Sequence, residues 1–324
     1  MPRLSLDEQF ARLSEAVDRG DQETLRSELK AALQDRSNLV VERAAKLMAQ
    51  HELTDLIPDA RATFERMLSK PVKSDPGCIA KTAICAALRT LGEADLAFFR
   101  QHVSYEQFEP YFGGLEDKAA GLRVECLLAL VEHRAEGFLE TAVDLLFDSV
   151  AAARGGAVRA VAASARPEAP LLLRMKARMG DESSEVMGEV LSGIVTLPSP
   201  DVTFLASFLD GPDASVAGEA AFALAESRRP EAPGLILARW RRAPHDPMGT
   251  TFLTALALCR HEEALDALCE IAANQELELA KQAMSALQQS PYLARVRQAL
   301  GAQLTDCLQA ERLRYFEELF GEGA

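Results

Sequence analysis

A repeat constrains this chain more than any other feature. Eight stretches carry a helix rich in small residues and then a second helix, at intervals of roughly 30 to 40 residues. In one of them Val41, Ala44, Ala45 and Met48 have the i, i+3, i+4, i+7 spacing of a helix face. We equate one apolar position across the repeats: Leu47, Leu88, Leu130, Ala165, Ile194, Leu224, Leu258 and Leu287. The pattern predicts an all-α fold of the α-solenoid type, a superhelical stack in which each helix pair contacts only its neighbours.

A duplicated tetrapeptide supports the repeat. Pro167-Glu168-Ala169-Pro170 recurs as Pro230-Glu231-Ala232-Pro233, and an arginine precedes each copy. Each copy also precedes an apolar run and then a basic cluster. Because proline is tolerated in the first turn of a helix, both copies are interpreted as the entry to a second helix.

The composition favours helices over strands. Hydrophobic residues make up 48% of the 324 residues, but aromatic residues only 6%. The apolar content therefore rests on Ala and Leu, which are strong helix formers, while aromatic and β-branched residues favour strands.

The charge and the cysteines indicate the surroundings of the chain. A formal net charge of −14 disfavours nucleic acid as a partner, because phosphate backbones repel such a chain. The six cysteines are scattered without a C-x-x-C pair, so we expect buried thiols in a reducing compartment. The N-terminal segment has no continuous apolar core, and no apolar run is long enough to span a membrane. We expect a cytoplasmic protein that has no signal peptide and does not contact a membrane.

The sequence divides into three segments. Residues 1–36 are predicted to form an N-terminal helical cap, and Ser5 and Glu8 have the spacing of a capping box. Residues 37–304 are predicted to form the repeat array of about eight helix pairs. Residues 305–324 are predicted to form an amphipathic helix that caps the last repeat; alternatively, it docks onto a partner or onto a second copy of the chain.

One segment resembles the first helix of the HEAT-like (PBS-lyase-type) α-helical repeat family. It runs from Asp213 to Leu224, and Asp117 and Asp246 stand at similar helix starts. In that family an Asp caps the helix, and small residues such as Ala220 and Ala223 let neighbouring helices approach closely. The resemblance covers most of residues 38–304 and implies a fold without specifying a function. Residues 71–114 depart from it because their loops are rich in proline and glycine, so the stack is expected to be irregular there.

The resemblance also leaves enzyme alternatives open. HEAT-like deoxyhypusine hydroxylases bind two irons with four His-Glu pairs, but this chain has only His51-Glu52 and His261-Glu262. His133 occupies a similar place without a following Glu, and the alternative interpretation is that these histidines complement helix C-termini. HEAT-like bilin lyases and alkylpurine DNA glycosylases share the repeat, but nothing here marks their sites. No nucleophile motif or phosphate-binding loop is present, so we expect no enzyme and assign no catalytic, cofactor-binding or metal-binding residues.

Two basic clusters reverse the sign of the charge locally. One follows each copy of the tetrapeptide, and both are candidate partner-binding residues: Arg174, Lys176, Arg178, Arg228, Arg229, Arg239, Trp240, Arg241 and Arg242. Trp and Arg are typical of binding hot spots, and Arg binds carboxylates in a two-pronged manner. The alternative is a structural role, in which the basic residues complement helix ends and pair with acidic neighbours, and Trp240 anchors the core.

The sequence therefore favours a non-catalytic scaffold or adaptor without a cofactor. We expect the second helices of the stack to line its concave face, where these basic residues would hold an acidic surface of a protein partner. The competing hypothesis is an enzyme or enzyme subunit that resembles the bilin lyases or the di-iron hydroxylases.

Overall fold

The computed structural model describes residues 5–305 and 307–321, and it confirms an all-α protein. In this part of the chain there are 20 α-helices, two short 3-10 helices and one two-stranded sheet. The helices fall into two compact units, Met1–Ala169 and Pro170–Ala324. The boundary lies within the predicted array of residues 37–304, and each unit is described by itself.

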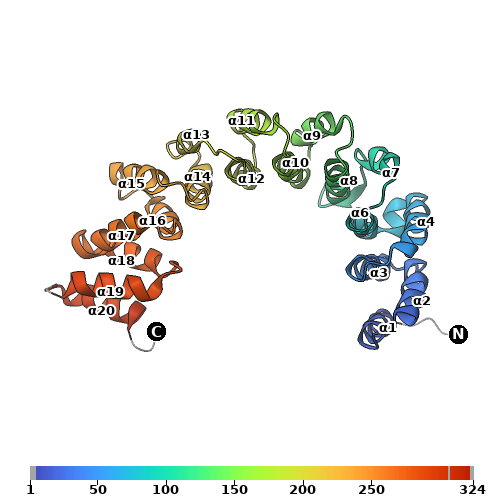
Figure 1. Cartoon of the computed structure of the whole chain (residues 1–324), viewed down its shortest axis with the longest axis horizontal. Helices are drawn as coiled ribbons and strands as arrows, with labels where there is room; N and C mark the ends of the chain where they lie inside the picture. The colour runs from blue at the N-terminus through green and yellow to red at the C-terminus, as the bar shows by residue number, and fades with distance from the viewer. Residues whose placement is uncertain (1–4, 306, 322–324) are drawn as a thin grey trace. The chain divides into compact units, whose positions relative to one another are not determined.

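The N-terminal unit runs from α1 to α10 (Figure 1). Its elements are α1 (Leu6–Asp18), α2 (Gln22–Leu33), α3 (Asn38–Gln50), η1 (Thr54–Leu56), α4 (Ile57–Leu68), α5 (Pro71–Ser74), η2 (Pro76–Cys78), α6 (Ile79–Thr90), α7 (Leu96–His102), β1 (Phe108–Tyr111), β2 (Gly114–Asp117), α8 (Ala120–Glu132), α9 (Phe138–Leu146) and α10 (Ala151–Ala163). The predicted capping box opens α1, because Ser5 and Glu8 each bond the other's backbone N–H.

The C-terminal unit contains the remaining helices. They are α11 (Ala169–Met179), α12 (Ser184–Val195), α13 (Val202–Ala206), α14 (Ala214–Glu226), α15 (Ala232–Arg242), α16 (Gly249–Leu258), α17 (Glu262–Asn274), α18 (Leu277–Leu287), α19 (Leu293–Leu304) and α20 (Ala310–Phe320). Both tetrapeptides lead into a second helix as predicted, since α11 begins at Ala169 and α15 at Ala232.

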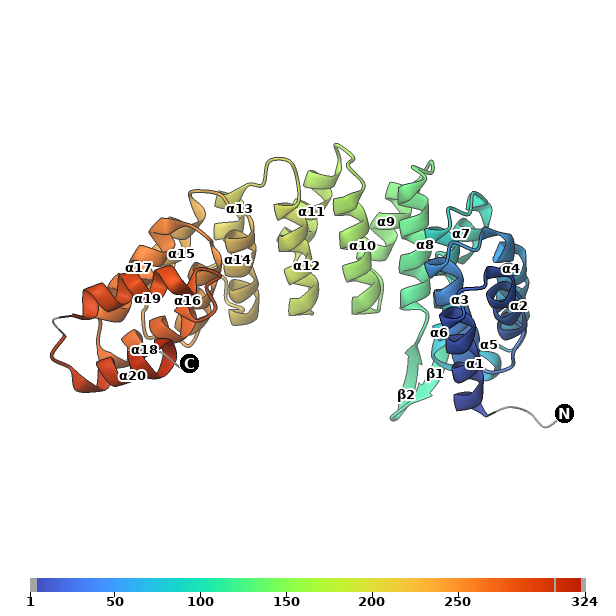
Figure 2. The ribbon, with the colours of Figure 1, turned by 60° about the horizontal axis from the view of Figure 1, so that its bottom comes forward.

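In each unit the helices form two rows. The first helices of the repeats pack on one another in order, α3 on α6, α6 on α8 and α8 on α10, and then α12 on α14, α14 on α16 and α16 on α18. The second helices α4, α7, α9, α11, α13, α15, α17 and α19 form the other row (Figures 1 and 2). At the end of the first row of the C-terminal unit, α20 packs on α18. The predicted segment 305–324 contains α20, and residues 306 and 322–324 lie outside the described residues.

An aspartate precedes the first helix in seven repeats. In six of them its carboxylate accepts the backbone N–H two residues later at 2.7–3.0 Å, as in Asx turns: Asp35, Asp117, Asp148, Asp181, Asp213 and Asp246. The seventh, Asp75, accepts instead from the backbone of Ala80 and Lys81. These bonds satisfy N–H groups that a helix start leaves without a partner.

A left-handed residue ends many of the same helices. The positive φ angles lie at Glu52, Gly92, Arg134, Ala165, Arg228 and Arg260, one after each of α3, α6, α8, α10, α14 and α16. Glycine is the usual residue at this position because a Cβ is strained there, yet only one of the six is a glycine.

These left-handed residues correct three of the equated apolar positions. Ala165 is itself an exposed left-handed residue, Leu258 is exposed, and Leu47 is buried but lies five residues before Glu52. The buried equivalents lie four residues before the left-handed residue and are Val161, Leu256 and Met48, which match Leu224 before Arg228. The equated positions were wrong there because small and apolar residues occur in every turn of these helices, so the sequence offers more than one match.

A β-hairpin interrupts the helices of the N-terminal unit. It begins within the segment 71–114, which was expected to be irregular, and its second strand extends beyond that segment to Asp117. β1 and β2 pair antiparallel, with Pro110 opposite Leu115 and Tyr111 opposite Gly114. Phe112 and Gly113 form the turn, and Gly113 has a φ of 78°. The helical prediction missed these strands because they are only four residues each and follow no helical period.

The first helices of the N-terminal unit pack closely. Gly156 on α10 is buried against α8, and a Cβ atom added to it would lie 2.2 Å from a methyl carbon of Val124. Glycine is therefore required at this contact. The helices of the described residues do not reach the length and hydrophobicity needed to cross a bilayer.

The left-handed helix ends generate a prediction about stability. Ala165→Gly should raise the free energy of unfolding by about 0.5–1 kcal/mol, because it removes the strain of a Cβ at positive φ. The matched change Gly92→Ala should lower it by about 1 kcal/mol, since no neighbouring atom would touch the new Cβ and only the backbone strain differs. Urea denaturation followed by circular dichroism measures both, and equal midpoints for all three proteins would contradict the prediction.

Candidate functional site

The structure places the predicted basic residues on α11, on α15 and in the turn that precedes α15. Two of the nine candidates are buried, which excludes them from a binding surface: Lys176 and Trp240. Lys176 forms an ion pair with Asp181 at 2.8 Å, and Trp240 packs in the core at 2% exposure. The structural interpretation is therefore correct for these two residues.

The arginines of α15 are largely occupied by acidic neighbours. Arg239 pairs with Asp246 at 2.8 Å and with Asp210 at 3.0 Å. Arg242 donates to both carboxylate oxygens of Asp210, at 2.8 and 2.9 Å. Both bonds come from the same guanidinium nitrogen, Nη2, and the Arg242 side chain remains exposed. Arg241 is exposed and makes no ion pair among the described residues. The cluster mainly ties α15 to the loops on either side of it.

The arginines in the turn before α15 also make contacts within their own part of the repeat. Arg228 is the left-handed residue that ends α14, and its carbonyl oxygen contacts the His261 ring at 3.2 Å. Arg229 lies 3.8 Å from Glu231, and both side chains are about half exposed. Surface pairs of this kind contribute little to stability or binding.

The exposed face of α11 has a different chemistry. Leu171, Met175 and Met179 follow one another at intervals of four residues and are 71%, 41% and 62% exposed. Arg174 and Arg178 lie beside them on the same side of the helix and are also exposed. The buried side of α11 carries Ala169, Leu173 and Ala177. The helix therefore has an apolar core side and a second, outward apolar stripe flanked by positive charge, which we call the α11 face (Leu171, Arg174, Met175, Arg178 and Met179).

The duplicated repeat provides an internal comparison. The tetrapeptides align α11 with α15, 63 residues later, and the buried positions correspond: Leu173 with Ile236 and Ala177 with Trp240. The outward positions do not correspond, because α15 has Gly234, Ala238 and Arg242 where α11 has Leu171, Met175 and Met179. Packing within the repeat thus does not require large apolar residues at these positions.

Two phenylalanines hold the arginines of the α11 face in place. The Arg174 guanidinium lies 4.1 Å from the ring centroid of Phe204 on α13, and it pairs with Asp201 at 2.8 Å. Arg178 lies 4.8 Å from Phe204 and 6.0 Å from Phe208. The hydrogen bond from Arg174 is the main reason that the pKa of Asp201 is lowered. Stacking on aromatic rings fixes the positive charges beside the apolar stripe.

A hollow of 360 Å³ continues the α11 face toward α13. It is lined by Pro170, Leu171, Arg174, Ile194, Leu197, Ser199, Asp201 and Phe204. Most of these residues are apolar, with one charged group of each sign at the edge. A side chain of a partner could enter this hollow and bury apolar area there.

The expectation that second helices line a concave face is wrong. Taken by itself, each unit curves toward its row of first helices, and the second helices lie on the outer side (Figure 1). In the C-terminal unit the inner row carries a hollow between α12 and α14 that is lined by Glu185, Glu189, Glu219 and Glu226. Burial raises the pKa of Glu219 there. An acidic partner would be repelled by these carboxylates, so the α11 face on the outer row suits it better.

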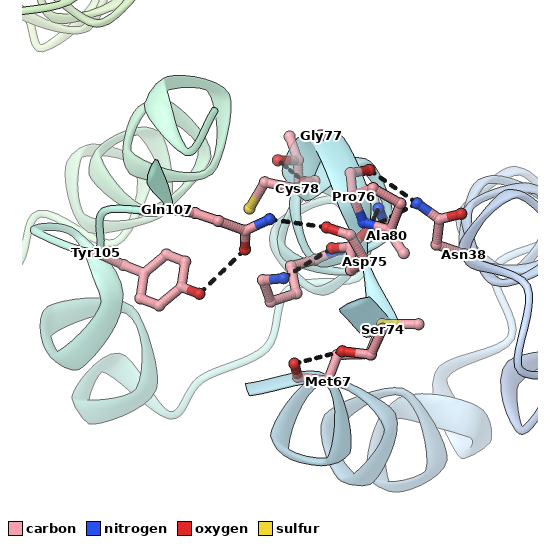
Figure 3. A network of polar contacts seen from close by, with 12 residues as sticks. Asn38, Met67, Ser74, Asp75, Pro76, Gly77, Cys78, Ala80, Tyr105 and Gln107 are labelled. Carbon is pink, nitrogen blue, oxygen red and sulfur yellow. Dashed lines mark hydrogen bonds and ion pairs between the residues drawn. The ribbon is translucent and has the colours of Figure 1, made fainter. Parts of the chain in front are cut away.

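A buried polar network joins the hairpin to the helices of the N-terminal unit (Figure 3). Asp75 and Lys81 form a fully buried ion pair at 2.9 Å, and Asn38 donates to the same carboxylate at 3.1 Å. Gln107 donates to the carbonyl oxygen of Asp75 at 2.8 Å and accepts from the Tyr105 hydroxyl at 3.1 Å. Burial is the main cause that raises the pKa of Tyr105 to about 12.

This network contains the kinds of residues that form active sites, but a substrate could not reach them. Each oxygen of the Asp75 carboxylate accepts two hydrogen bonds, which leaves no room for a substrate. A second buried pair, Asp117 and Arg123 at 2.6 Å, extends to Asp148 at 2.9 Å. Because these side chains are enclosed, their role is to fix the hairpin base against α6 and α8.

The histidine–glutamate pairs do not occupy matching positions. His51 ends α3 and precedes the left-handed Glu52, as His133 ends α8 and precedes Arg134. His261 instead follows the left-handed Arg260 and begins α17, two residues later in the repeat. Glu262 pairs with Arg295 at 2.6 Å. The described residues contain no group of three or more His, Cys, Asp or Glu side chains that could hold a metal ion.

Comparisons with known proteins add little to this description. No protein-family model and no curated protein matches the chain. Among solved structures, it is similar to human deoxyhypusine hydroxylase in complex with glycerol, with 20% identity, a TM-score of 0.32, and coverage of 81% of this chain and 93% of that chain. Two engineered proteins are also similar. The first has 15% identity and a TM-score of 0.39, and the match covers 90% of this chain and 87% of that chain. The second has 16% identity and a TM-score of 0.17, and the match covers 90% of this chain and 94% of that chain. TM-scores this low carry no inference about function.

The buried pair of Asp75 and Lys81 predicts a large effect of a single substitution. Lys81→Met should lower the free energy of unfolding by about 3–5 kcal/mol, because it leaves the Asp75 carboxylate buried without its counter-charge. The double variant Asp75→Asn/Lys81→Met should recover part of this loss, since a neutral amide is less costly to bury. Urea denaturation measures both variants, and a loss below about 1 kcal/mol for Lys81→Met would contradict the assignment.

Asp117 predicts a dependence of stability on pH. Burial raises the pKa of its carboxyl, but the N–H groups of Gln107 and Ala119 and the charge of Arg123 outweigh burial and lower it. A folded-state pKa below the unfolded value of about 3.9 adds stability above that pH, which is lost as the pH falls through the folded pKa. The difference in urea midpoint between wild type and Asp117→Asn should therefore be constant from pH 7 to 5 and shrink below about pH 4. A difference that stays constant to pH 3 would contradict it.

Proposed function

We propose that this protein is an α-solenoid of the HEAT-like (PBS-lyase-type) repeat family that acts in the cytoplasm as a non-catalytic scaffold. Its site is the α11 face, and its ligand is a segment of a protein partner that combines apolar and acidic side chains. The partner chemistry agrees with the acidic surface expected from the sequence, but the site is moved from a concave face to the outer row of second helices.

The regularity of the two rows supports the solenoid part of the proposal. An aspartate begins seven first helices at positions 35, 75, 117, 148, 181, 213 and 246, and left-handed residues end six. The intervals between the aspartates are 31–42 residues, within the roughly 20–50 residues that are typical of solenoid repeats. Within each unit, each first helix packs on the next one along the chain.

One observation carries the functional part, which is the contrast between α11 and α15. Two helices from the same duplicated repeat share their buried positions, but only α11 exposes three large apolar side chains. An exposed Leu or Met lowers solubility and adds nothing to packing, so a continuous stripe of them marks a contact surface. Met is also common at surfaces that adapt to a partner, because its side chain is flexible.

The charges at this face specify the partner. Arg178 stacks on Phe204 of α13 at the edge of the apolar stripe and makes no ion pair among the described residues, so it meets a carboxylate of an incoming segment. Arg174 stacks on the same ring and would exchange its pairing with Asp201 for a carboxylate of the partner. The rest of the chain is strongly acidic, so a locally positive face directs an acidic segment to this helix. The buried polar clusters of the N-terminal unit are enclosed, which also supports binding over catalysis.

Photo-crosslinking tests the proposal in cells that make the protein. A crosslinking amino acid at position 171 should give a covalent adduct with another protein, and position 238 on α15 is the matched control that should not. Mass spectrometry identifies the adduct, and the crosslinked peptide should be rich in apolar and acidic residues. The additional change Arg174→Glu/Arg178→Glu should reduce the adduct about tenfold, because it reverses the charge at the edge of the stripe.

Two results would contradict the proposal. The first is the absence of any adduct from position 171 in protein that is folded and abundant. The second is the same set of adducts from positions 171 and 238, which would show that both helices meet proteins only by collision.

A further inference from the structure

The hairpin of the N-terminal unit exposes a second apolar surface. Phe108, Tyr111, Phe112 and Leu115 are all exposed, and Phe112 at the turn is 97% exposed. Pro110 lies opposite Leu115 in the pairing of the strands, so these two residues share one face of the hairpin. The strands extend beyond the N-terminal end of α8 (Figure 2), where the aromatic turn is open to a partner.

The hairpin is an addition to the repeat. The interval from Asp75 to Asp117, which contains the hairpin, is 42 residues. The preceding interval from Asp35 to Asp75 is 40 residues, and those from Asp117 onward are 31–33. The hairpin residues do not contribute to the packing of α6 on α8, because the hairpin leaves the row of helices. An insertion whose side chains are mainly apolar and exposed indicates a function in binding.

The base of the hairpin is rigid. Gln107 donates through its backbone N–H to Asp117 at 2.8 Å, and Glu109 accepts from the N–H of Gly77 at 2.7 Å. Asp117 is in turn held by Arg123. The aromatic turn is therefore presented in one orientation, which reduces the entropy lost when it binds.

Side chains carry the binding, and strand pairing does not. Pro110 in β1 has no N–H group to offer to an added strand. The strands are also only four residues long, which gives little backbone for a partner strand. Insertion of Phe112 and its neighbours into an apolar surface is the remaining way to cover them.

The hairpin region has a net negative charge. Glu116 pairs with Lys118 at 2.7 Å, and Glu109 accepts hydrogen bonds from Gly77 and Gln107. Glu106 is exposed and makes no ion pair in the described part of the chain.

The α11 face has the opposite character, since Leu171, Met175 and Met179 lie beside arginines. Arg178 likewise makes no ion pair among the described residues, although it stacks on Phe204. The two surfaces are thus complementary in both hydrophobicity and charge.

These two surfaces also account for a large share of the exposed apolar side chains. They contain seven of the 16 large hydrophobic residues that are exposed in the described residues, and each group spans fewer than ten positions. One contact between these two surfaces would bury the apolar side chains of both. We propose that the hairpin of one copy of this chain docks on the α11 face of a second copy. This inference rests on the proposed function, because it names an occupant of the same site.

The contact is heterologous, because two different surfaces meet. Each copy keeps one free hairpin and one free α11 face, so association continues head to tail into a ring or an open chain. A partner protein with the same chemistry as the hairpin competes with it for the α11 face.

The test uses two variants that each lack one surface. Phe112→Ser/Leu115→Ser removes the hairpin contact, and Leu171→Ser/Met179→Ser removes the α11 contact. Ala238→Ser on α15 is the matched control, and circular dichroism checks that all variants are folded. Analytical ultracentrifugation over a range of concentrations should show that wild type and Ala238→Ser self-associate. Each double variant should do so about tenfold or more weakly, from the apolar area that it no longer buries.

Mixing the two double variants is the decisive step. Each is defective in one surface and intact in the other, so an equimolar mixture should form a one-to-one dimer that does not grow further. A wild type that stays monomeric at every concentration overturns the inference, as does a mixture that stays monomeric or a hairpin variant that associates like wild type. None of these results removes the proposed function, which fails only if position 171 gives no specific adduct with another protein.

Discussion

The aspartate carboxylate that precedes seven of the first helices is the interaction on which the repeat depends. Asp35, Asp117, Asp148 and their counterparts accept the N–H group two residues later and so fix the direction in which each helix starts. A helix start leaves N–H groups without intrahelical partners, and a short polar side chain satisfies them at little entropic cost. Because each first helix within a unit packs on the next, one fixed start constrains its neighbour.

The cations that accompany these aspartates differ between the two units. In the N-terminal unit they come six residues later, from the first helix itself: Lys81 follows Asp75, and Arg123 follows Asp117. In the C-terminal unit they come from the preceding second helix, as Lys176 does for Asp181 and Arg239 for Asp246. This shift accounts for Lys176 and Arg239 in the basic clusters after the two tetrapeptides. Positive charge in a repeat protein is therefore weak evidence for a binding surface until its intramolecular partners are known.

The sequence predicted the helices better than it predicted the surface. Period and composition were sufficient for the helix pairs, and the duplicated tetrapeptide located the starts of α11 and α15, because these features depend on local chemistry. The spacing of Leu171, Met175 and Met179 was also visible, but a stripe at intervals of four residues has the same appearance whether it faces the core or water. Only the packing of Leu173 and Ala177 on the opposite side of α11 decides between the two.

The close approach of α8 and α10 at Gly156 has a mechanical consequence. The Val124 methyl groups occupy the space that a side chain at position 156 would need, so these two helices cannot slide past each other without losing dispersion contacts along their length. At the α12–α14 pair a similarly close approach is made at Gly188, but by the flexible side chain of Glu219, which can move aside. Under load, the α8–α10 joint should therefore resist sliding more than the α12–α14 joint, because the branched Val124 has no other place to go.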